Sequence, residues 1–531
     1  MTQQRNLPFR KWVPYGVGIA AAFVVLVPIM LINGAYTGIS INISNSLGVL
    51  SEDISMAYYA ASAGMAAAYP IVPKIRAIVT TKTVLLLDLI LQVFFCLVCA
   101  RTTHMEVIIV CSFLIGILKA FAMLEMIILL KPFFSPRNVR VEFYSYFYPI
   151  VFSVGQVSMV ITAQLAYSYM WQYIYYGVMI LLFLAIAVVL VVFRYGRRPI
   201  CFPYKEIDWT SLFLVSAVLL LFIYVCTYGK VKDWFASGQL TVCAGLIPVF
   251  VYLFIRRQQH SETPYLRLEV LSSPKAAVGY LYMAIAMFFS ASSALTSSYV
   301  NTVLQVDSVH ANALYLWMIP GFVVGAVFCR WWYKRQYRFR VLAAWGIACF
   351  AAYLAILYFG LTPTGQYEYL RLPMLLRGTG MMIIFIAFGV FAVEDMNPKL
   401  MIYNAFFLIG VRSALSPALS AAFFNNVLYR TQQQNLAILA EGLDAQNPLA
   451  VSKYTDALNS ALARHHSLAD AQLLATDSLY TAVQVQSLLL SIKQIIGYML
   501  MAAIVVAVIT RFIPFHKTRI VKTVKTGEDM A

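Results

Sequence analysis

The sequence predicts an all-α polytopic membrane protein with fourteen transmembrane helices. Hydrophobic residues make up 61% of the 531 residues, whereas charged residues make up only 11%. Soluble domains are about 45–50% apolar and about 25% charged, so a water-soluble fold cannot hide this much apolar surface. Long apolar runs recur along the chain, and cations collect in alternate loops between them. These two patterns define the topology.

Fourteen stretches are long and apolar enough to cross a bilayer, which requires about 20 mostly apolar residues. The first is too long for the apolar core of a signal peptide, and no small-residue cleavage site follows it, so we expect it to be retained. The predicted spans are 13–36, 54–73, 83–100, 107–130, 143–166, 172–193, 210–228, 238–255, 276–302, 312–329, 341–361, 370–393, 400–424 and 485–510.

The 39 Lys and Arg residues predict the orientation of these spans. Most of them fall in alternate loops, together with both ends of the chain, and the opposite loops hold few. Because cytoplasmic loops are enriched in Lys and Arg, we expect both termini to be cytoplasmic. The net charge of +17 then reflects loops that face anionic lipid headgroups, and it does not indicate a nucleic-acid-binding protein.

One long extramembrane segment, residues 425–484, is predicted to form a helical hairpin on the periplasmic side. Ser467 followed by Asp470 is typical of a helix start, because the hydroxyl and the carboxylate can satisfy backbone N–H groups in the first turn. Two interpretations remain open for this hairpin. It either covers the neighbouring membrane helices or provides a docking site for a periplasmic partner.

Two carboxylates lie inside predicted spans and are candidates for proton coupling. Asp88 and Glu125 each lie about six residues from a cytoplasmic helix end, which places them about 9 Å deep. A carboxylate in a low-dielectric interior can carry a proton at neutral pH. Lys119 precedes Glu125 by six residues, a rotation of about 240° around the helix, so we expect Lys119 to find its partner elsewhere.

Buried cations are candidates for lining a substrate cavity. Lys119, Arg377 and Arg412 all fall well inside spans, and Lys493 enters the last span. Such residues usually face the interior of a helix bundle. A structural alternative is that each arginine bonds backbone carbonyls of neighbouring helices, and that Lys493 reaches back to the interface.

Several polar and small residues complete the predicted interior. Gln156 and Gln164 lie about 80° apart on one helix and are candidates for facing the cavity. Small residues allow helices to approach closely or to slide during a transport cycle. We assign this packing or gating role to Gly155, Ser158, Thr162, Gly321 and Gly325.

The sequence predicts no metal site, no cofactor and no enzymatic activity. Most of the eight cysteines lie within apolar runs, including the pair Cys96 and Cys99, so we assign them to packing. The chain contains no H-E-x-x-H, G-x-S-x-G or Walker A motif. A membrane-embedded enzyme acting on lipid-linked substrates is therefore the weaker alternative to a transporter.

Over nearly its whole length the chain resembles the 14-helix drug:proton antiporter-2 family of the major facilitator superfamily, in particular its multidrug exporter B type. The resemblance depends on the order and spacing of short motifs. They are "WQYIYY" (Trp171–Tyr176), "IDW" (Ile207–Trp209), "LLRGTG" around Arg377, the small-residue run that begins at Arg412, and "NPLAVSKYTDAL" before the last helix.

The chain also departs from that family at several motifs. The loop "PKIRAIVTTK" keeps only the basic character of the family's G-x-L-A-D-x-x-G-R-R motif. Ser158-Met159 and Thr162-Ala163 stand where the family has Gly-Pro and Gly-Gly, and Ile32 replaces its helix-one aspartate. The neighbouring Asn33 is a further cavity candidate. Ser112 stands at the position of the family's helix-four arginine.

The resemblance implies two six-helix bundles, within residues 1–200 and 261–531, joined by two inserted helices within residues 201–260. It further implies proton-driven export of amphipathic small molecules across a bacterial inner membrane by alternating access. A periplasmic adaptor and an outer-membrane channel are the partners that it suggests. The altered motifs leave a second possibility open, which is a transport-inactive or differently coupled partner or sensor with the same fold.

Overall fold

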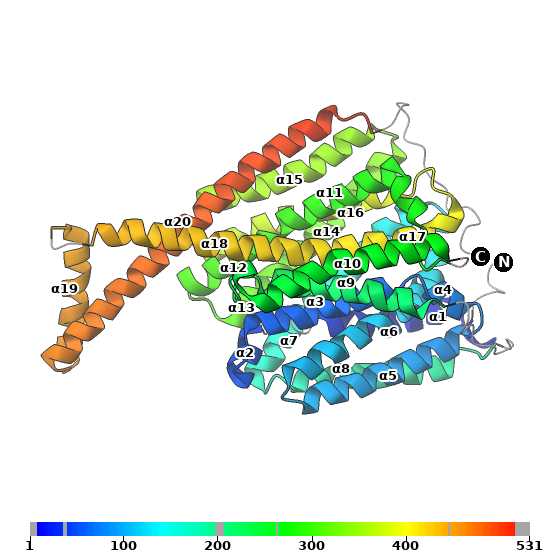
Figure 1. Ribbon diagram of the computed structural model, residues 1–531, viewed down its shortest axis with the longest axis horizontal. Coiled ribbons are helices and arrows are strands. Elements are labelled where there is room, and N and C mark those ends of the chain that lie inside the picture. Colours follow the sequence, from blue (N-terminus) through cyan, green and yellow to red (C-terminus); the bar gives the residue numbers. More distant parts are fainter. Residues whose placement is uncertain (1–7, 35–39, 197–206, 262–263, 444–445, 516–531) are drawn as a thin grey trace.

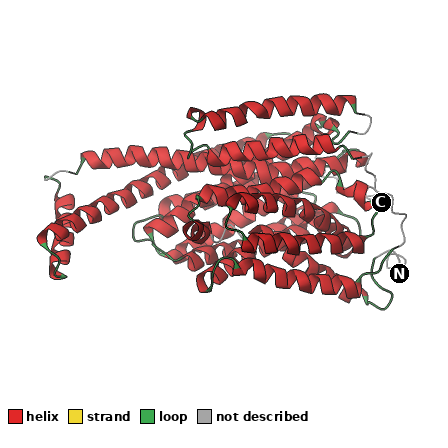
Figure 2. Ribbon diagram, turned by 60° about the horizontal axis from the view of Figure 1, so that its bottom comes forward, coloured by secondary structure: helices red, strands yellow, loops and turns green. Residues whose placement is uncertain are grey.

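The computed structural model describes residues 8–34, 40–196, 207–261, 264–443 and 446–515, which form an elongated helical bundle (Figure 1). Helices are the regular structure of these residues (Figure 2), apart from isolated β-bridge positions such as the pair Phe9 and Phe193. Thirteen of the helices are long and apolar enough to cross a membrane. The predicted class, an all-α polytopic membrane protein, is confirmed.

The chain divides for description into a first half, an inserted pair and a second half. The first half contains α1 (Tyr15–Gly34), α2 (Ser40–Leu47), α3 (Ser51–Ala68), α4 (Val72–Arg76), α5 (Thr81–Arg101), α6 (Met105–Phe134), α7 (Arg140–Ser168) and α8 (Tyr173–Val192). The inserted pair consists of α9 (Trp209–Tyr228) and α10 (Gly238–His260), with the 3₁₀ turn η2 (Trp234–Ala236) between them.

The second half contains the remaining helices and two short π-helical segments. They are η3 (Leu268–Ser272), α11 (Pro274–Ala291), α12 (Ser293–Ser298), the π segment η4 (Tyr299–Val303), α13 (Ser308–Ala313), η5 (Leu314–Trp317), α14 (Met318–Lys334), α15 (Phe339–Gly360), η6 (Tyr367–Leu370), α16 (Arg371–Phe391), α17 (Pro398–Ile409), the π segment η7 (Gly410–Leu415), α18 (Ser416–Glu441), α19 (Pro448–Ala463) and α20 (Leu468–Phe512).

The predicted span 54–73 is the one whose helix is long enough to cross a membrane but falls short of the hydropathy of a membrane helix. Its helix, α3, runs from Ser51 to Ala68, and its mean hydropathy is low because Glu52 and Asp53 lie in its first turn together with serines along its length. Small side chains suit a buried position, and α3 packs closely against α6. A Cβ added at Gly64 would lie 2.2 Å from the Phe113 carbonyl oxygen, and one at Gly116 only 1.9 Å from the Ala61 oxygen. Close packing therefore explains why the rest of α3 consists largely of small side chains.

Local sequence explains where several helices begin. Asp208 caps α9 by accepting a hydrogen bond from the Ser211 N–H, and Asn447 caps α19 in the same way. Ser467 accepts from the Asp470 N–H at 3.2 Å and donates to its carboxylate at 2.7 Å, so α20 begins where the sequence predicted. These side chains satisfy N–H groups that have no partner within the helix.

The second half is built around α16, which is buried along almost its whole length from Arg377 onward. Gly321 and Gly325 on α14 face its backbone. A Cβ at Gly321 would lie 2.2 Å from the Leu375 carbonyl oxygen, and one at Gly325 would lie 2.8 Å from the Thr379 oxygen. The two helices can approach this closely only because both positions lack a side chain.

The two halves meet along two helices of the first half, α3 and α7, and the inserted pair lies beside α3. Helix α7 packs against α14 and α16, and α3 packs against α17 and η7. Helix α9 contacts both α3 and α18, whereas α10 is mostly exposed and packs mainly against α9. Tyr228 at the end of α9 donates a hydrogen bond to Asp53 on α3, and Trp234 donates to Asn426 on α18 at 3.4 Å.

The bundle has two distinct ends. We call one the basic end, where the segments 69–82, 131–140 and 330–340 connect successive helices. From the other end, the arm end, α18 and α20 continue away from the bundle, and α19 joins them at the far tip (Figure 1). The residues of α18 and α20 beyond the bundle, together with α19, form what we call the arm. The arm contains the predicted hairpin region 425–484, although its outer helices are direct continuations of membrane helices.

Candidate functional site

Glu125 lies near the basic end of α6 and is tied to the connection between α3 and α5. The Arg76 Nε atom is 3.0 Å from Glu125 Oε1, and the Thr81 hydroxyl donates to Oε2 at 2.9 Å. The Glu125 side chain is 2% exposed, whereas that of Arg76 is 31% exposed. The Glu125 carboxylate is therefore buried and is neutralised by the Arg76 guanidinium, which reaches it from the basic end. Lys119, as expected from the helix geometry, is not its partner.

Asp88 lies in a different environment, inside the first half. It is 2% exposed on α5, which packs against α6 and α8. Its Oδ2 atom accepts a hydrogen bond from the Gln92 side-chain amide at 2.8 Å. Among the described residues, Asp88 Oδ1 and Gln92 Oε1 are buried and have no hydrogen-bond partner. The two carboxylates that the sequence placed at a similar depth thus differ, since only Glu125 has a cationic partner in the described part of the chain.

Lys119 is a buried lysine in the middle of α6. This residue is only 7% exposed. The hydrogen bonds and ion pairs found within the described ranges do not include it, so the partner that we expected for Lys119 is not seen there. Burying an ammonium group without a partner is unfavourable, and such a group strongly attracts an anion.

Arg377 is a second buried cation, located near the arm end of α16. Its Nε atom donates to the Ser290 hydroxyl at 3.1 Å, and the thioethers of Met318 and Met374 lie 3.5 and 3.7 Å from Nη1. The Tyr315 ring lies 5.8 Å from its Cζ atom. All of these neighbours belong to the second half. No carboxylate pairs with Arg377 in the described residues, and the expected carbonyl acceptors are not among its contacts.

Arg412 is a third interior cation, and its neighbours are aromatic. It lies half-buried in η7, and its Cζ atom is 5.3 Å from the Tyr148 ring, 5.7 Å from that of Phe152 and 5.5 Å from that of Phe385. A guanidinium at these distances is attracted by the negative faces of the rings. The structural alternative of a carbonyl-bonded arginine does not describe Arg412, because no carbonyl bonds it within the described chain.

The remaining polar candidates are distributed around α7. Gln156 Oε1 is buried and has no hydrogen-bond partner in the described ranges, whereas Gln164 is exposed and lies 3.5 Å from the Ser168 hydroxyl. The Ser158 hydroxyl donates to the Leu31 carbonyl of α1 at 3.1 Å, and Thr162 donates within its own helix. The side chain of Asn33 lies outside the described part of the structure.

The small residues predicted to pack or gate differ in their surroundings. Gly321 and Gly325 lie directly against α16, and the buried Ser158 contacts α1. Gly155 is different, because a Cβ added there would have no described heavy atom within 4 Å. The proposed gating surface on α7 is therefore tightly packed at Ser158 and open at Gly155.

Sequence reasoning missed a row of aromatic residues on α7 that contacts the second half. Tyr144 and Tyr148 are stacked with their ring centroids 4.9 Å apart and their planes within 2° of parallel. Arg330 of α14 donates to the Tyr146 hydroxyl, and its Cζ atom is 4.9 Å from that ring. The dense aromatic run "FYSYFYPIVF" could have indicated this contact. Only the aromatic composition of this run could have indicated the contact, because Arg330, for example, follows Tyr146 by 184 residues.

Arg140, at the first turn of α7, makes another contact between the halves at the basic end. It is 5% exposed, and its guanidinium donates to the Val393 carbonyl oxygen at 3.2 Å. It also lies 3.0 Å from the Met401 thioether. The sequence placed this residue among the loop cations that face lipid headgroups, so its burial between the halves is a finding of the structure.

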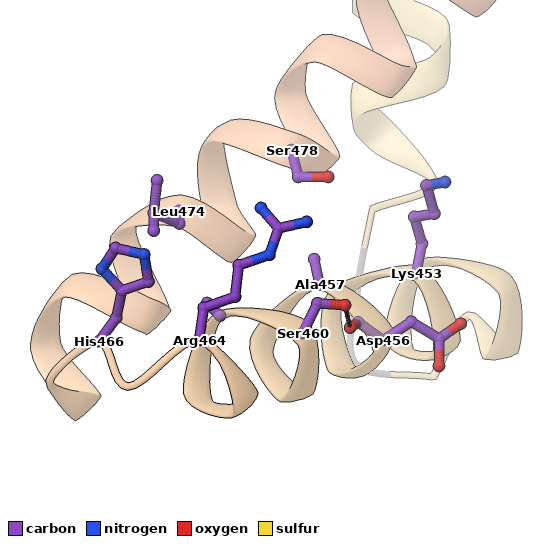
Figure 3. A pocket seen from close by; sticks show the side chains of 9 residues that line it. Lys453, Asp456, Ala457, Ser460, Arg464, His466, Leu474 and Ser478 are labelled. Carbon is purple, nitrogen blue, oxygen red and sulfur yellow. Dashed lines mark hydrogen bonds between the residues drawn. The ribbon is translucent and has the colours of Figure 1, made fainter.

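The arm carries a polar cleft of about 360 Å³ between α19 and the start of α20 (Figure 3). Lys453, Arg464 and His466 line it together with Asp456, and Arg464 points across it toward Ser478 on α20. Asp456 receives a long contact of 3.5 Å from the Ser452 hydroxyl. The salt bridges of the described residues do not include Lys453 or Arg464, so the cleft has an excess of positive charge.

The sequence matches no family model and no curated protein. Solved structures nevertheless share its fold. A mutant of the peptide transporter POT is 14% identical, with a TM-score of 0.53 over 96% of this chain and 99% of that one. The nucleoside transporter NupG is 11% identical (TM-score 0.48, 89% of this chain and 99% of that one), and the human organic anion transporter MFSD10 is 11% identical (TM-score 0.47, 90% and 100%).

At these identities the likeness concerns the fold, and the match to the peptide transporter carries it. It agrees with the thirteen membrane-spanning candidates and with the two halves that meet through α3, α7, α14 and the α17–α18 region. The chain is therefore a multi-pass membrane protein with the major facilitator fold.

Proposed function

We propose that this protein is a secondary transporter that moves amphipathic small molecules, with a preference for organic anions, by alternating access of its two halves. Two interior arginines and a buried lysine, which an anion would keep charged, support the preference for anions. Lys119, Arg377 and Arg412 have no carboxylate partner among the described residues, whereas Glu125 is neutralised by Arg76. An anionic substrate would supply the missing negative charge, because a buried cation is stabilised strongly by a paired anion.

Transport of a fluorescent aromatic anion by the purified protein in liposomes tests this proposal. We expect the protein to accelerate the movement of the anion anilinonaphthalene sulfonate across the membrane. It should accelerate the movement of the cation tetraphenylphosphonium less, when each rate is compared with that in liposomes without protein. Arg377→Gln should reduce anion transport about tenfold or more, since it removes a charge-assisted contact. Equal transport of both probes would contradict the preference for anions, and transport of neither would contradict the transporter itself.

We further propose that the transport is coupled to protons and directed out of the cell. Glu125 and Asp88 remain the candidates that bind the proton, and their different surroundings favour different roles. Glu125 can exchange its bond with Arg76 for a proton when the basic end opens. Asp88 has no cation within the described residues to keep it charged. A proton on its carboxyl group would supply a hydrogen-bond donor beside Asp88 Oδ1 and Gln92 Oε1, which are both acceptors without a partner in the described residues.

An imposed pH gradient separates these two roles. Glu125→Gln should abolish the acceleration of transport by the gradient while leaving exchange without a gradient intact. Asp88→Asn, which keeps a neutral side chain of the same size, should leave both unchanged if Asp88 is neutral throughout the cycle. Gradient-driven transport that persists in Glu125→Gln would remove this residue from the coupling scheme.

The proposed orientation follows from the distribution of cations, with the basic end in the cytoplasm of a bacterial inner membrane. The arm would then lie in the periplasm. We propose that it docks a periplasmic adaptor that leads to an outer-membrane channel, and that acidic side chains of the adaptor enter the cleft lined by Lys453 and Arg464. Reversing both charges with glutamate should weaken binding of a periplasmic adaptor protein to the purified protein, without affecting transport in liposomes.

The second candidate function is that of a transport-inactive sensor or partner with the same fold. The altered motifs favour it, because the loop that contains Arg76 lacks the glycines and the aspartate of the related exporters. An enzyme is the weakest candidate, and within the described residues no group of three His, Cys, Asp or Glu side chains is placed to hold a metal ion. Transport in liposomes by the purified protein would exclude the sensor.

A further inference from the structure

The aromatic cage around Arg412 is built from both halves of the protein. Tyr148 and Phe152 belong to α7 in the first half, whereas Phe385 and Arg412 belong to the second half. The Phe152 ring also contacts those of Phe385 and Phe322, at centroid distances of 5.5 and 5.8 Å. The guanidinium therefore lies at a junction where α7 meets the second half.

This junction lies between the basic end and the middle of the bundle. Tyr148 is eight residues from the start of α7, or about 12 Å along the helix, and Phe385 is six residues from the end of α16, or about 9 Å. On the basic side of the cage, the stacked Tyr144 and Tyr148 face α16, and the Tyr148 hydroxyl would lie 3.6 Å from a Cβ at Gly389. Further contact between the halves at this end comes from Arg140 and Val393.

The charge of Arg412 is held by rings alone in the described residues. A cation over an aromatic face is attracted less strongly than one paired with a carboxylate or sulfonate through two hydrogen bonds. An anion that reaches the guanidinium would therefore draw it away from the cage. The π-helical turn that carries Arg412 provides the local freedom for such a change, because π segments interrupt the regular hydrogen bonding of a helix.

We propose that Arg412 is the residue through which an anionic group of the substrate releases the contact between the two halves at the basic end. Without the anion, the guanidinium holds α7 against α16. With the anion bound, Arg412 pairs with it, the rings lose their cation, and the basic end opens. This proposal rests on the proposed transport of anions, but the contact itself can be tested without any substrate.

Spin labels at the basic end provide that test. Arg137→Cys in the first half and Lys334→Cys in the second are exposed positions, and they can be labelled in a background whose native cysteines have been replaced. In the ligand-free protein we expect Arg412→Gln to raise the population with a long distance between the labels by about threefold or more. Arg412→Lys should give a smaller rise, since it keeps a cation over the rings.

Arg377→Gln is the matched control. It also removes an interior arginine, but its neighbours Ser290, Met318 and Met374 all lie in the second half, so the distance distribution should not change. Tyr148→Leu removes one ring and keeps the cation, and it should shift the distribution in the same direction as Arg412→Gln. A wild-type distribution in both Arg412→Gln and Tyr148→Leu would overturn the proposal.

The anion is tested in the same labelled protein. Saturating anilinonaphthalene sulfonate should increase the long-distance population of the wild type and have no further effect on Arg412→Gln, whereas tetraphenylphosphonium should have none on either. An equal response of wild type and Arg412→Gln to the sulfonate would contradict the role of Arg412 as its receptor. If transport in liposomes fails while the ligand-free distances shift as expected, the proposed function is wrong and the contact between the halves remains.

Discussion

Arg76 and Glu125 connect the end of the short helix α4 to α6, with the Arg76 Nε atom 3.0 Å from Glu125 Oε1. The lysine six residues earlier on α6 has no part in this pair. A carboxylate in an apolar helix thus has an architectural partner, and the coupling role proposed for it requires that this partner be exchangeable.

The first prediction concerns this pair. Glu125→Gln should lower the free energy of unfolding by about 1–2 kcal/mol, because it breaks an ion pair of which one member is buried and the other partly exposed. Arg76→Gln should destabilise the protein at least as much, since it leaves a buried carboxylate without its cation. Thermal unfolding of both single variants and of the double variant measures the coupling. Additive effects would show that the two side chains do not interact.

A second prediction concerns Lys82 at the start of α5, which is only 1% exposed. Its Nζ atom donates to the carbonyl oxygens of Leu190 and Phe193 at 2.9 and 3.0 Å, so it satisfies the last turn of α8. Lys82→Met keeps most of the packing but leaves these carbonyls without the cation, and we expect it to cost about 1–3 kcal/mol. Lys230→Met, at a partly exposed lysine, serves as the control. An unchanged melting temperature for Lys82→Met would contradict this role.

The third prediction concerns the close contact between α14 and α16. Gly321→Leu has no room, because its Cβ alone would lie 2.2 Å from the Leu375 carbonyl oxygen, so the helices must separate. We expect loss of the folded monomer in detergent, as measured by size-exclusion chromatography with a fluorescent tag. Gly155→Ala has open space around it and should be tolerated or slightly stabilising, by about 0.5–1 kcal/mol.

A fourth prediction concerns pH and the cap of α9. Burial raises the pKa of Asp208, but hydrogen bonds from Arg257 and Ser211 outweigh this effect, so its pKa lies below the ordinary value. A lowered pKa means that the folded state favours the charged form. The stabilisation from Asp208 is therefore present above about pH 4 and is lost as the pH falls through its folded-state pKa.

Thermal melts of the wild type and Asp208→Asn between neutral and acidic pH test this dependence. The variant should be less stable by about 1 kcal/mol near neutrality, and the difference should shrink below about pH 4. A constant difference at every pH would show that the Asp208 charge contributes nothing.

The sequence was sufficient for the class of fold because its two strongest signals, hydropathy and loop charge, act locally. Ser467 and Asp470 similarly identified the start of α20. Hydropathy was less informative for α3, whose small side chains are suited to packing against α6 and not to lipid. Hydropathy also ended the span of α18 at 424, although the helix continues to Glu441, and began the last span at 485, although α20 starts at Leu468. A helix can leave the apolar layer without ending.

The environment of each candidate residue was beyond the reach of the sequence, because it depends on contacts between distant segments. Glu125 is bonded to residues that precede it by more than 40 positions, and Arg412 lies among rings that come from α7 and α16. The helical rotation between Lys119 and Glu125 did correctly exclude a direct pair. No local pattern could have identified Tyr148 and Phe152 as neighbours of Arg412.

Helix α20 runs without interruption for 45 residues, about 68 Å, from the tip of the arm to the opposite end of the bundle. Because α20 is one continuous helix, a tilt of its membrane-embedded part also moves its outer end. In the proposed alternating-access cycle, rotation of the second half would displace α19 in proportion to its distance from the pivot. The adaptor proposed for the arm would thus detect, at a distance from the bundle, which way the second half is facing in that cycle.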